Sequence, residues 1–178
     1  MKRKLKNSSG FSLVEMLCAT AVLMLLCVML NSGLSVTMKT YFDLTAEAET
    51  QLLLNSLTNA IAGELRYAFE VSGGGDASKS PTYNDGLYLD WSSGQVLVKG
   101  GNDGDKELLP KEKEGTDRGG AYKNGEYQVE DMEIAYDRDT ACFTLNLTVG
   151  CKSSGIRAEA KNVVIRCLNP PEKEGTTP

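Results

Sequence analysis

The chain has 178 residues, a formal net charge of −5 and no histidine. Without histidine it lacks the commonest general base and the commonest metal ligand, which excludes a hydrolase built on a Ser-His-Asp triad. No spaced cluster of Asp, Glu or Cys offers another catalytic constellation, so we expect no enzyme, no metal and no cofactor. The length suits one long helix and one small domain, and a second full domain is not expected.

The N-terminal segment combines a polar leader with an apolar run. The leader KRKLKNSSG ends at Gly10, and residues 11–30 follow with Glu15 as their only ionisable side chain apart from cysteine thiols. As a helix this run would be about 30 Å long, which is the thickness of the hydrocarbon core of a bilayer. We therefore expect residues 11–30 to enter or cross a membrane. A carboxylate there costs on the order of a few kcal/mol and marks a functional site with a partner.

The cleavage site of a secretory signal follows its apolar run, whereas here the small residue Gly10 precedes the run. The order of a basic leader, Gly10, Phe11 and then Glu15 resembles the class III signal of type IV prepilins and pseudopilins. This resemblance implies cleavage between Gly10 and Phe11 by a membrane prepilin peptidase, followed by N-methylation of Phe11. It also implies an assembly role for Glu15, as the partner of the Phe11 amine of another subunit. The alternative is a signal anchor that happens to contain a Glu.

The charges of the leader predict the topology. Its four basic residues place it in the cytoplasm by the positive-inside rule, so everything after about residue 31 is extracytoplasmic. Removal of residues 1–10 would leave 15 Lys and Arg against 24 Asp and Glu, a net charge of −9. Such a chain is a poor nucleic-acid binder, because phosphate binding requires clustered Lys and Arg.

A second helical pattern follows the apolar run and the weak stretch Asn31-Ser32-Gly33. We predict a long helix over residues 11–72, ended by Gly73-Gly74-Gly75. Its second half carries an apolar stripe with steps of three and four, namely Leu54, Leu57, Ile61, Leu65 and Ala68. Three acidic residues on this half are interpreted as a solvated face, with basic residues of a neighbouring subunit as the alternative partner: Asp43, Glu47 and Glu49.

The apolar period changes to two after residue 85. Leu87, Leu89 and Trp91 precede Ser93-Gly94, and Val96 and Val98 follow it, which predicts a β-hairpin with a two-residue turn. Residues 100–126 are rich in Gly and charge and are predicted to be a long mobile loop. Its acidic residues do not have the spacing of an EF-hand calcium loop. Further strands are predicted over residues 129–136, 142–149 and 156–167, before a loose C-terminal tail.

The predicted fold is α+β, with a long N-terminal helix packed on a small antiparallel β-sheet head, as the pilin-like resemblance also implies. The predicted parts are a leader over residues 1–10, a helix over 11–72 that is membrane-embedded over 11–30, and a head over 73–178.

The cysteines of the head define a register prediction. If Ser154 and Gly155 are the central residues of a hairpin, Cys142 lies directly opposite Cys167, at a spacing that permits a disulfide in an oxidising exterior. A bulge near Asn162 is the alternative, and it would shift the register by one and separate the two cysteines. Cys18 and Cys27 lie in the apolar run and are interpreted as small buried hydrophobic residues.

The leading functional hypothesis is a structural subunit, a pilin or a minor pilin or pseudopilin, of a type IV pilus, competence pilus or type II secretion pseudopilus. The resemblance implies several partners, namely other pilin or pseudopilin subunits, prepilin peptidase, an inner-membrane assembly platform and membrane lipid. The protein would be a single-pass membrane protein and then part of an extracellular, periplasmic or cell-wall fibre. The alternative is a membrane-anchored extracytoplasmic binding domain or enzyme that uses residues 11–30 only as an anchor. Cleavage after Gly10 distinguishes the two hypotheses, because only the subunit hypothesis requires it.

Overall fold

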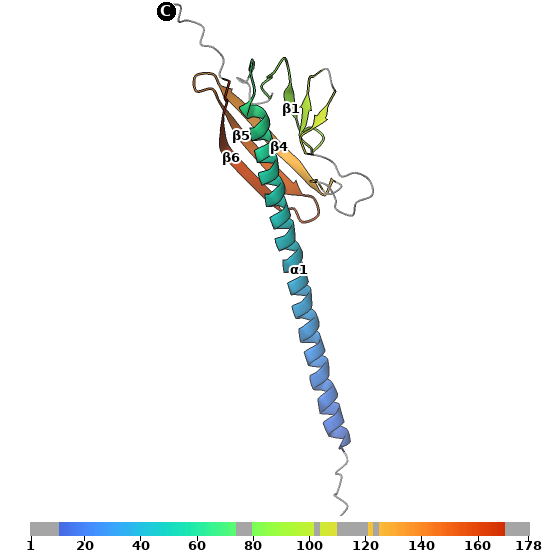
Figure 1. The fold of residues 1–178 in the computed structure, drawn as a ribbon. Helices are drawn as coiled ribbons and strands as arrows, with labels where there is room; N and C mark the ends of the chain where they lie inside the picture. The colour runs from blue at the N-terminus through green and yellow to red at the C-terminus, as the bar shows by residue number, and fades with distance from the viewer. Residues whose placement is uncertain (1–10, 74–79, 102–103, 110–120, 123–124, 170–178) are drawn as a thin grey trace, which may run out of the picture. The chain divides into compact units, whose positions relative to one another are not determined.

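The computed structural model describes residues 11–73, 80–101, 104–109, 121–122 and 125–169. The elements follow one another as α1 (Leu13–Arg66), β1 (Tyr88–Asp90), β2 (Leu97–Lys99), β3 (Lys106–Glu107), β4 (Tyr127–Asp137), β5 (Cys142–Cys151) and β6 (Arg157–Arg166). The strands form two antiparallel sheets, in the orders β1-β2-β3 and β4-β5-β6 (Figure 1). The predicted α+β architecture, a long N-terminal helix with a small antiparallel head, is confirmed.

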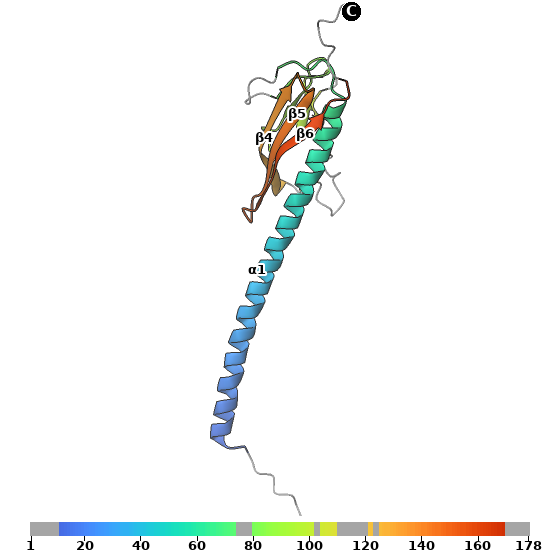
Figure 2. The same ribbon diagram turned by 90° about the vertical axis from the view of Figure 1, so that its left-hand side faces the viewer.

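The chain divides into two compact units, Met1–Phe42 and Asp43–Pro178. We call the second unit the head. It contains the last part of α1, which lies along the β4-β5-β6 sheet (Figure 2). This part of the helix buries one stripe, consisting of Ala46, Thr50, Leu53, Leu54, Leu57, Ile61 and Leu65. The predicted stripe is therefore confirmed for Leu54, Leu57, Ile61 and Leu65, whereas Ala68 is buried but lies beyond the end of the helix.

The central strand β5 supplies the other side of the core. Phe143, Leu145, Leu147 and Val149 alternate along it and are all buried, as predicted. They belong to one hydrophobic cluster with the buried stripe of α1. Burial of a side chain of this size contributes about 1.5–3 kcal/mol relative to exposure, so this cluster is the main source of stability of the head.

The helix ends at Arg66, earlier than the predicted limit at residue 72. The Leu168 N–H donates to the Arg66 carbonyl at 2.8 Å, and the Phe69 N–H donates to Asn84 Oδ1 at 2.7 Å. Groups from distant parts of the head therefore bind the backbone where the helix stops. These contacts end the helix before the glycine run, so the predicted end at that run is wrong. Gly74 and Gly75 lie outside the described residues.

The first hairpin has the predicted register. Leu89 pairs with Val98, but the pairing ends at Asp90 with Leu97, so the connection over residues 91–96 is longer than the predicted two-residue turn. Gly94 has φ +77°, a left-handed conformation that glycine adopts without strain. Its N–H donates to the Trp91 carbonyl at 2.9 Å.

The segment predicted as a long loop contains a short strand. The pairs Leu97 with Glu107 and Val98 with Lys106 add β3 to the hairpin, which corrects the prediction for residues 100–126. Polar side chains on a two-residue strand leave no alternating pattern to detect. Within the same segment, the buried Tyr122 hydroxyl accepts the Val96 N–H at 3.1 Å. The rest of the predicted loop, at residues 102–103, 110–120 and 123–124, lies outside the described residues, as do the leader and residues 170–178 of the tail.

The register of β5 and β6 differs from the predicted one. Cys142 pairs with Arg166, not with Cys167, so the predicted direct opposition of the two cysteines is wrong. The connection is longer than a two-residue turn, because the Cys151 N–H donates to the Ile156 carbonyl at 2.9 Å. The alternative with a bulge near Asn162 is the arrangement that the structure has.

The side chain of Asn146 stabilises this bulge. The register shifts between Leu145 and Leu147, and Asn162 on β6 has φ +54°. Asn146 lies at the shift, where its Oδ1 accepts the Asn162 N–H at 2.8 Å and its Nδ2 donates to Glu133 on β4 at 3.0 Å. One amide therefore satisfies the backbone of the bulge and joins all three strands.

Candidate functional site

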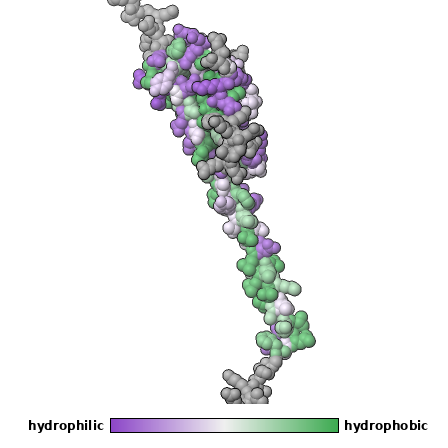
Figure 3. All heavy atoms as spheres, turned by 45° about the vertical axis from the view of Figure 1, so that its right-hand side comes forward, coloured by the Kyte–Doolittle hydropathy of each residue, from purple (hydrophilic) through white to green (hydrophobic). Residues whose placement is uncertain are grey.

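The first unit exposes an apolar surface along α1. Every described side chain from residue 11 to residue 42 is exposed, and an 18-residue window of the helix has a mean hydropathy of 2.5 with none of it buried. Figure 3 shows hydrophobic side chains, in green, covering much of this part of the helix. The helix is long and apolar enough to cross a membrane. An exposed apolar surface of this extent marks a site of contact with membrane or protein.

Glu15 caps the N-terminus of α1 through a reciprocal pair of hydrogen bonds with Ser12. The Ser12 N–H donates to Glu15 Oε2 at 2.9 Å, and the Glu15 N–H donates to Ser12 Oγ at 3.2 Å. The Met16 N–H donates to the Ser12 carbonyl at 3.2 Å. This is a capping box, in which residues three apart satisfy backbone donors that the helix leaves unpaired. The sequence signal for it is S-x-x-E at residues 12–15, so Glu15 has a role inside its own chain besides the intermolecular one.

The capping box leaves Glu15 able to bind a second donor. A carboxylate has about four acceptor positions, and the Ser12 N–H occupies one of them. Phe11, at 79% exposure, directly precedes Ser12, so cleavage before Phe11 would place the new α-amine next to the cap. Gly10, the other predicted processing residue, lies outside the described residues. The structure thus presents Phe11 and Glu15 at one exposed end of the apolar helix.

Hydroxyl groups past the apolar run are satisfied inside the helix. Ser32, Ser35, Thr37 and Thr40 each donate to the carbonyl four residues earlier, at 2.9–3.0 Å. Such bonds reduce the cost of placing a hydroxyl group in apolar surroundings. The weak stretch Asn31-Ser32-Gly33 is helical in this structure.

The cysteines form no cross-link. All five are free, and the predicted pair separates because residues next to each other along a strand point to opposite faces of a sheet. Cys167 is buried and its Sγ donates to the Ala68 carbonyl at 2.9 Å, while Cys142 is half-buried on the other face, where its neighbour across the sheet is Arg166. Cys18 and Cys27, interpreted as buried, are exposed in the isolated chain.

One of the three acidic residues that were predicted to form a solvated face of α1 has a hydrogen-bond partner in its own chain. Asp43 and Glu47 are exposed, in agreement with a solvated face, whereas Glu49 is half-buried and its Oε2 accepts the hydroxyl of Tyr127 on β4. Burial raises the pKa of Tyr127, and the Glu49 carboxylate raises it further. This hydrogen bond joins the helix to the sheet inside the head. Sequence reasoning missed it, because nothing along the chain marks two residues that are so far apart as neighbours.

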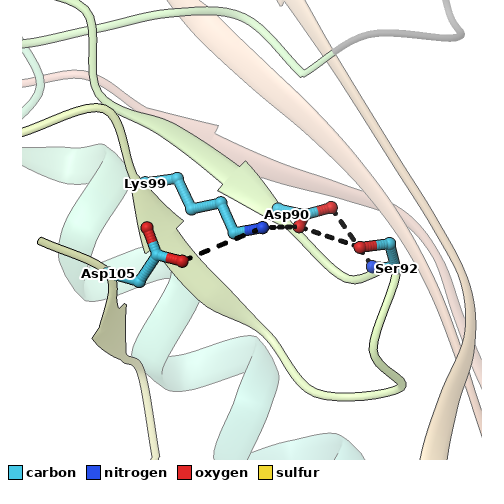
Figure 4. Close-up of polar contacts among 4 residues, drawn as sticks. All are labelled: Asp90, Ser92, Lys99 and Asp105. Carbon is cyan, nitrogen blue, oxygen red and sulfur yellow. Dashed lines mark hydrogen bonds and ion pairs between the residues drawn. The ribbon is translucent and has the colours of Figure 1, made fainter.

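An ionic cluster joins the strands of the small sheet (Figure 4). Lys99 Nζ lies 2.5 Å from Asp90 Oδ2 and 3.9 Å from Asp105 Oδ2. The Ser92 N–H and hydroxyl donate to the same Asp90 carboxylate, at 3.2 and 2.9 Å. Lys99 lowers the pKa of Asp90, and the two Ser92 donors lower it further. The lysine thus supplies the positive charge between these carboxylates, and among the described residues no group of His, Cys, Asp and Glu is arranged to hold a metal.

Comparison with known families matches the N-terminal segment alone. The family model of the prokaryotic N-terminal methylation motif matches residues 5–31, a range that includes Gly10, Phe11, Glu15 and the whole apolar run. Neither the curated proteins nor the solved structures gave a match. The motif is the one expected from the order of the leader, the small residue and the apolar helix. The chain therefore carries, over residues 5–31, the N-terminal methylation signal of type IV pilin-like proteins.

Proposed function

We propose that this chain is a structural subunit of a type IV pilus, a competence pilus or a type II secretion pseudopilus. The methylation motif at residues 5–31 carries the proposal, because it supports a type IV pilin-like substrate of prepilin peptidase that assembles with other pilin subunits. The exposed apolar surface of α1 adds to it, since such a surface needs lipid before assembly and other subunits afterwards.

The proposed mechanism starts with processing and ends with packing. Cleavage between Gly10 and Phe11 creates an α-amine, whose ordinary pKa near 8 gives it a positive charge at neutral pH, and N-methylation keeps that charge. In a fibre of staggered parallel helices, this amine meets the Glu15 carboxylate of a neighbouring subunit. Because an ion left alone in apolar surroundings costs several kcal/mol, the pair selects one axial register. The protein acts by polymerisation, without bond chemistry on a substrate.

The deciding experiment is an intact-mass measurement on the membrane-extracted protein. We expect a chain that begins at Phe11 and carries one added methyl group. A Gly10→Leu variant should stay uncleaved, because it enlarges the residue before the cut, whereas the neighbouring Ser9→Leu variant is the matched control and should be cleaved. A full-length wild-type chain, or a terminus beyond residue 30, would overturn the proposal in favour of a membrane anchor.

A further inference from the structure

The β4-β5-β6 sheet has an outer face, which lies on the side opposite α1. Side chains alternate between the two faces of a strand, and the buried residues of β5 belong to the core cluster that contains the α1 stripe. The residues between them, Thr144, Asn146 and Thr148, therefore point to the outer face. The edge strands expose most of their outward side chains there, namely Asp131, Ala135 and Asp137 on β4 and Arg157, Glu159, Lys161, Val164 and Arg166 on β6. The outer face is thus a surface of the head that another molecule can contact.

The charges of the outer face are separated by strand. β4 carries four carboxylates and no base, and we call these residues the acidic row: Glu130, Asp131, Glu133 and Asp137. β6 carries three bases and one carboxylate, which we call the basic row: Arg157, Glu159, Lys161 and Arg166. β5, between them, has no charged residue. Because neighbouring strands are about 4.8 Å apart, the two rows lie about 10 Å apart, with formal charges of −4 and +2.

Gly150 lets one ion pair cross β5. Any Cβ at this position would collide with the Glu130 carboxylate, so the absent side chain leaves room for Glu130 to reach over the central strand. There its Oε2 lies 2.6 Å from Nε of Arg157, the residue that pairs with Gly150 in the sheet. The other outward positions of β5 carry side chains, and among the described residues no second ion pair crosses the strand.

Other charges of the two rows have no ion-pair partner among the described residues. They include Asp131 on β4 and Arg166 on β6, whose side chains are exposed. Lys161, by contrast, pairs with Glu159 on its own strand, at 2.5 Å. The isolated head therefore presents unpaired negative charge at one edge of the sheet and unpaired positive charge at the other.

These two edges complement each other between two copies of the chain. When β6 of one copy lies beside β4 of the next, opposite net charges come together, whereas a two-fold contact between like edges would bring together charges of one sign. The favourable contact uses a different edge of each copy, so it repeats from copy to copy without closing, as a fibre needs. We propose that the basic row of β6 in one head binds the acidic row of β4 in the head of a second copy of this chain. This inference rests on the proposed function, because the fibre is what brings neighbouring heads together.

A photo-crosslinker in the basic row tests this interface directly. Val164, which is 65% exposed and stands between Lys161 and Arg166, is replaced by p-benzoylphenylalanine in the full chain, expressed in its native cells. After irradiation of isolated fibres, we expect a dimer on denaturing gels, in which mass spectrometry finds residue 164 linked to a β4 peptide of a second copy. The same replacement at Tyr67, which is exposed just after the end of α1, is the matched control and should not link to β4.

Charge reversal tests the electrostatic part of the interface. Arg166→Glu should lower the fibre content, relative to the membrane pool, by about fivefold, as for the loss of one surface ion pair per contact. Asp131→Lys should lower it by a similar factor from the other row. Arg66→Glu makes the same change as Arg166→Glu at an exposed position of α1 and should assemble as the wild type does. All three variants should keep the thermal transition of the wild type, which separates assembly from folding.

The outcomes distinguish the interface from the proposed function. The interface is overturned if residue 164 links only to another segment or to another protein, or if both row variants assemble like Arg66→Glu. A wild-type chain that enters no fibre overturns the proposed function and this interface together. A wild-type chain that enters fibres without the link to β4 overturns the interface alone.

Discussion

Glu15 has two roles, and each depends on a different property of its side chain. Capping depends on its hydrogen bonding, and pairing between subunits depends on its charge. Inside its own chain it caps α1 by accepting the Ser12 N–H, and in the proposed fibre it neutralises an amine of another subunit. A glutamine at this position would keep the capping box but lose the charge, because Gln and Glu both fit that motif. The Gln and Ala variants therefore separate the two roles.

We predict that Glu15→Gln and Glu15→Ala are both cleaved and retained in the membrane, and that both enter fibres poorly. The reason is that each leaves the Phe11 amine without its counter-ion in apolar surroundings. Fibre content measured against the membrane pool decides it, with Ser12→Ala as the control that weakens the cap but keeps the charge. Wild-type incorporation of Glu15→Gln would show that capping, not charge pairing, is what the residue contributes.

Tyr127 and Glu49 form a polar contact between helix and sheet in the head. We predict that Tyr127→Phe lowers the free energy of unfolding by about 1–3 kcal/mol, because the half-buried Glu49 carboxylate loses one hydrogen-bond donor. The midpoint of chemical denaturation measures the loss. Tyr67→Phe is the matched control, since the side chain of Tyr67 is 63% exposed. Equal midpoints for the two variants would contradict the prediction.

At the scale of single elements, the bulge of β6 keeps Cys142 and Cys167 apart. Because Cys142 and Cys167 lie on opposite faces of the sheet, we predict three free thiols in the head even under oxidising conditions. Alkylation of the native protein, followed by mass spectrometry, should modify the half-buried Cys142, whereas the buried Cys151 and Cys167 should react only after denaturation. A linked peptide pair that contains Cys142 and Cys167 would show the unbulged register instead.

The ion pair in the sheet β1-β2-β3 makes the stability of the head depend on pH. Lys99 lowers the pKa of Asp90, so this pair contributes stability that is present above the unfolded-state pKa of the carboxyl group and is lost as the pH falls through its folded-state pKa. With an ordinary Asp pKa of about 3.9, the loss occurs below about pH 4. At neutral pH the pair is fully charged.

We predict that Lys99→Met raises the pKa of Asp90 back towards its ordinary value, because it removes the main group that stabilises the carboxylate. Carboxyl chemical shifts followed by NMR over an acid titration measure this change. Lys106→Met, an equal loss of charge at an exposed position of β3, should leave Asp90 unchanged. If neither substitution changes the pKa of Asp90, the Ser92 donors, and not Lys99, lower that pKa.

For the whole molecule, the two units differ in what stabilises them. Every buried residue of the core cluster lies at or beyond Ala46, inside the head, whereas the described part of the first unit contributes no buried side chain. The first unit therefore depends on lipid or on other subunits to cover its apolar surface. The head carries its own hydrophobic core.

This division predicts that a chain without residues 1–36 is a soluble, folded monomer. It keeps the whole core and loses the exposed apolar run, so neither aggregation nor loss of the fold should follow. Size-exclusion chromatography with light scattering and a single cooperative thermal transition check this. A truncated chain that aggregates, or that unfolds without cooperativity, would show that the head needs the first unit to fold.

The sequence by itself determined those features that depend on residues close together along the chain. The methylation signal, the apolar run, the stripe from Leu54 to Leu65, the register of the β1-β2 hairpin and the alternation along β5 are all local patterns. Local patterns survive in the structure because the period of hydrophobic residues selects helix or strand and its buried face. The capping box of Ser12 and Glu15 belongs to the same class, because its two residues are only three positions apart.

Only the tertiary structure decided the features that join distant segments. The end of α1 at Arg66 depends on Leu168, the half-burial of Glu49 on Tyr127, and the separation of the cysteines on the bond between Asn146 and Asn162. The close approach of the β1-β2 connection to β4 depends on the hydrogen bond between the Val129 N–H and the Gly94 carbonyl. Each of these is a contact between groups far apart in sequence, and its energy depends on a geometry that exists only after the helix and both sheets have packed together.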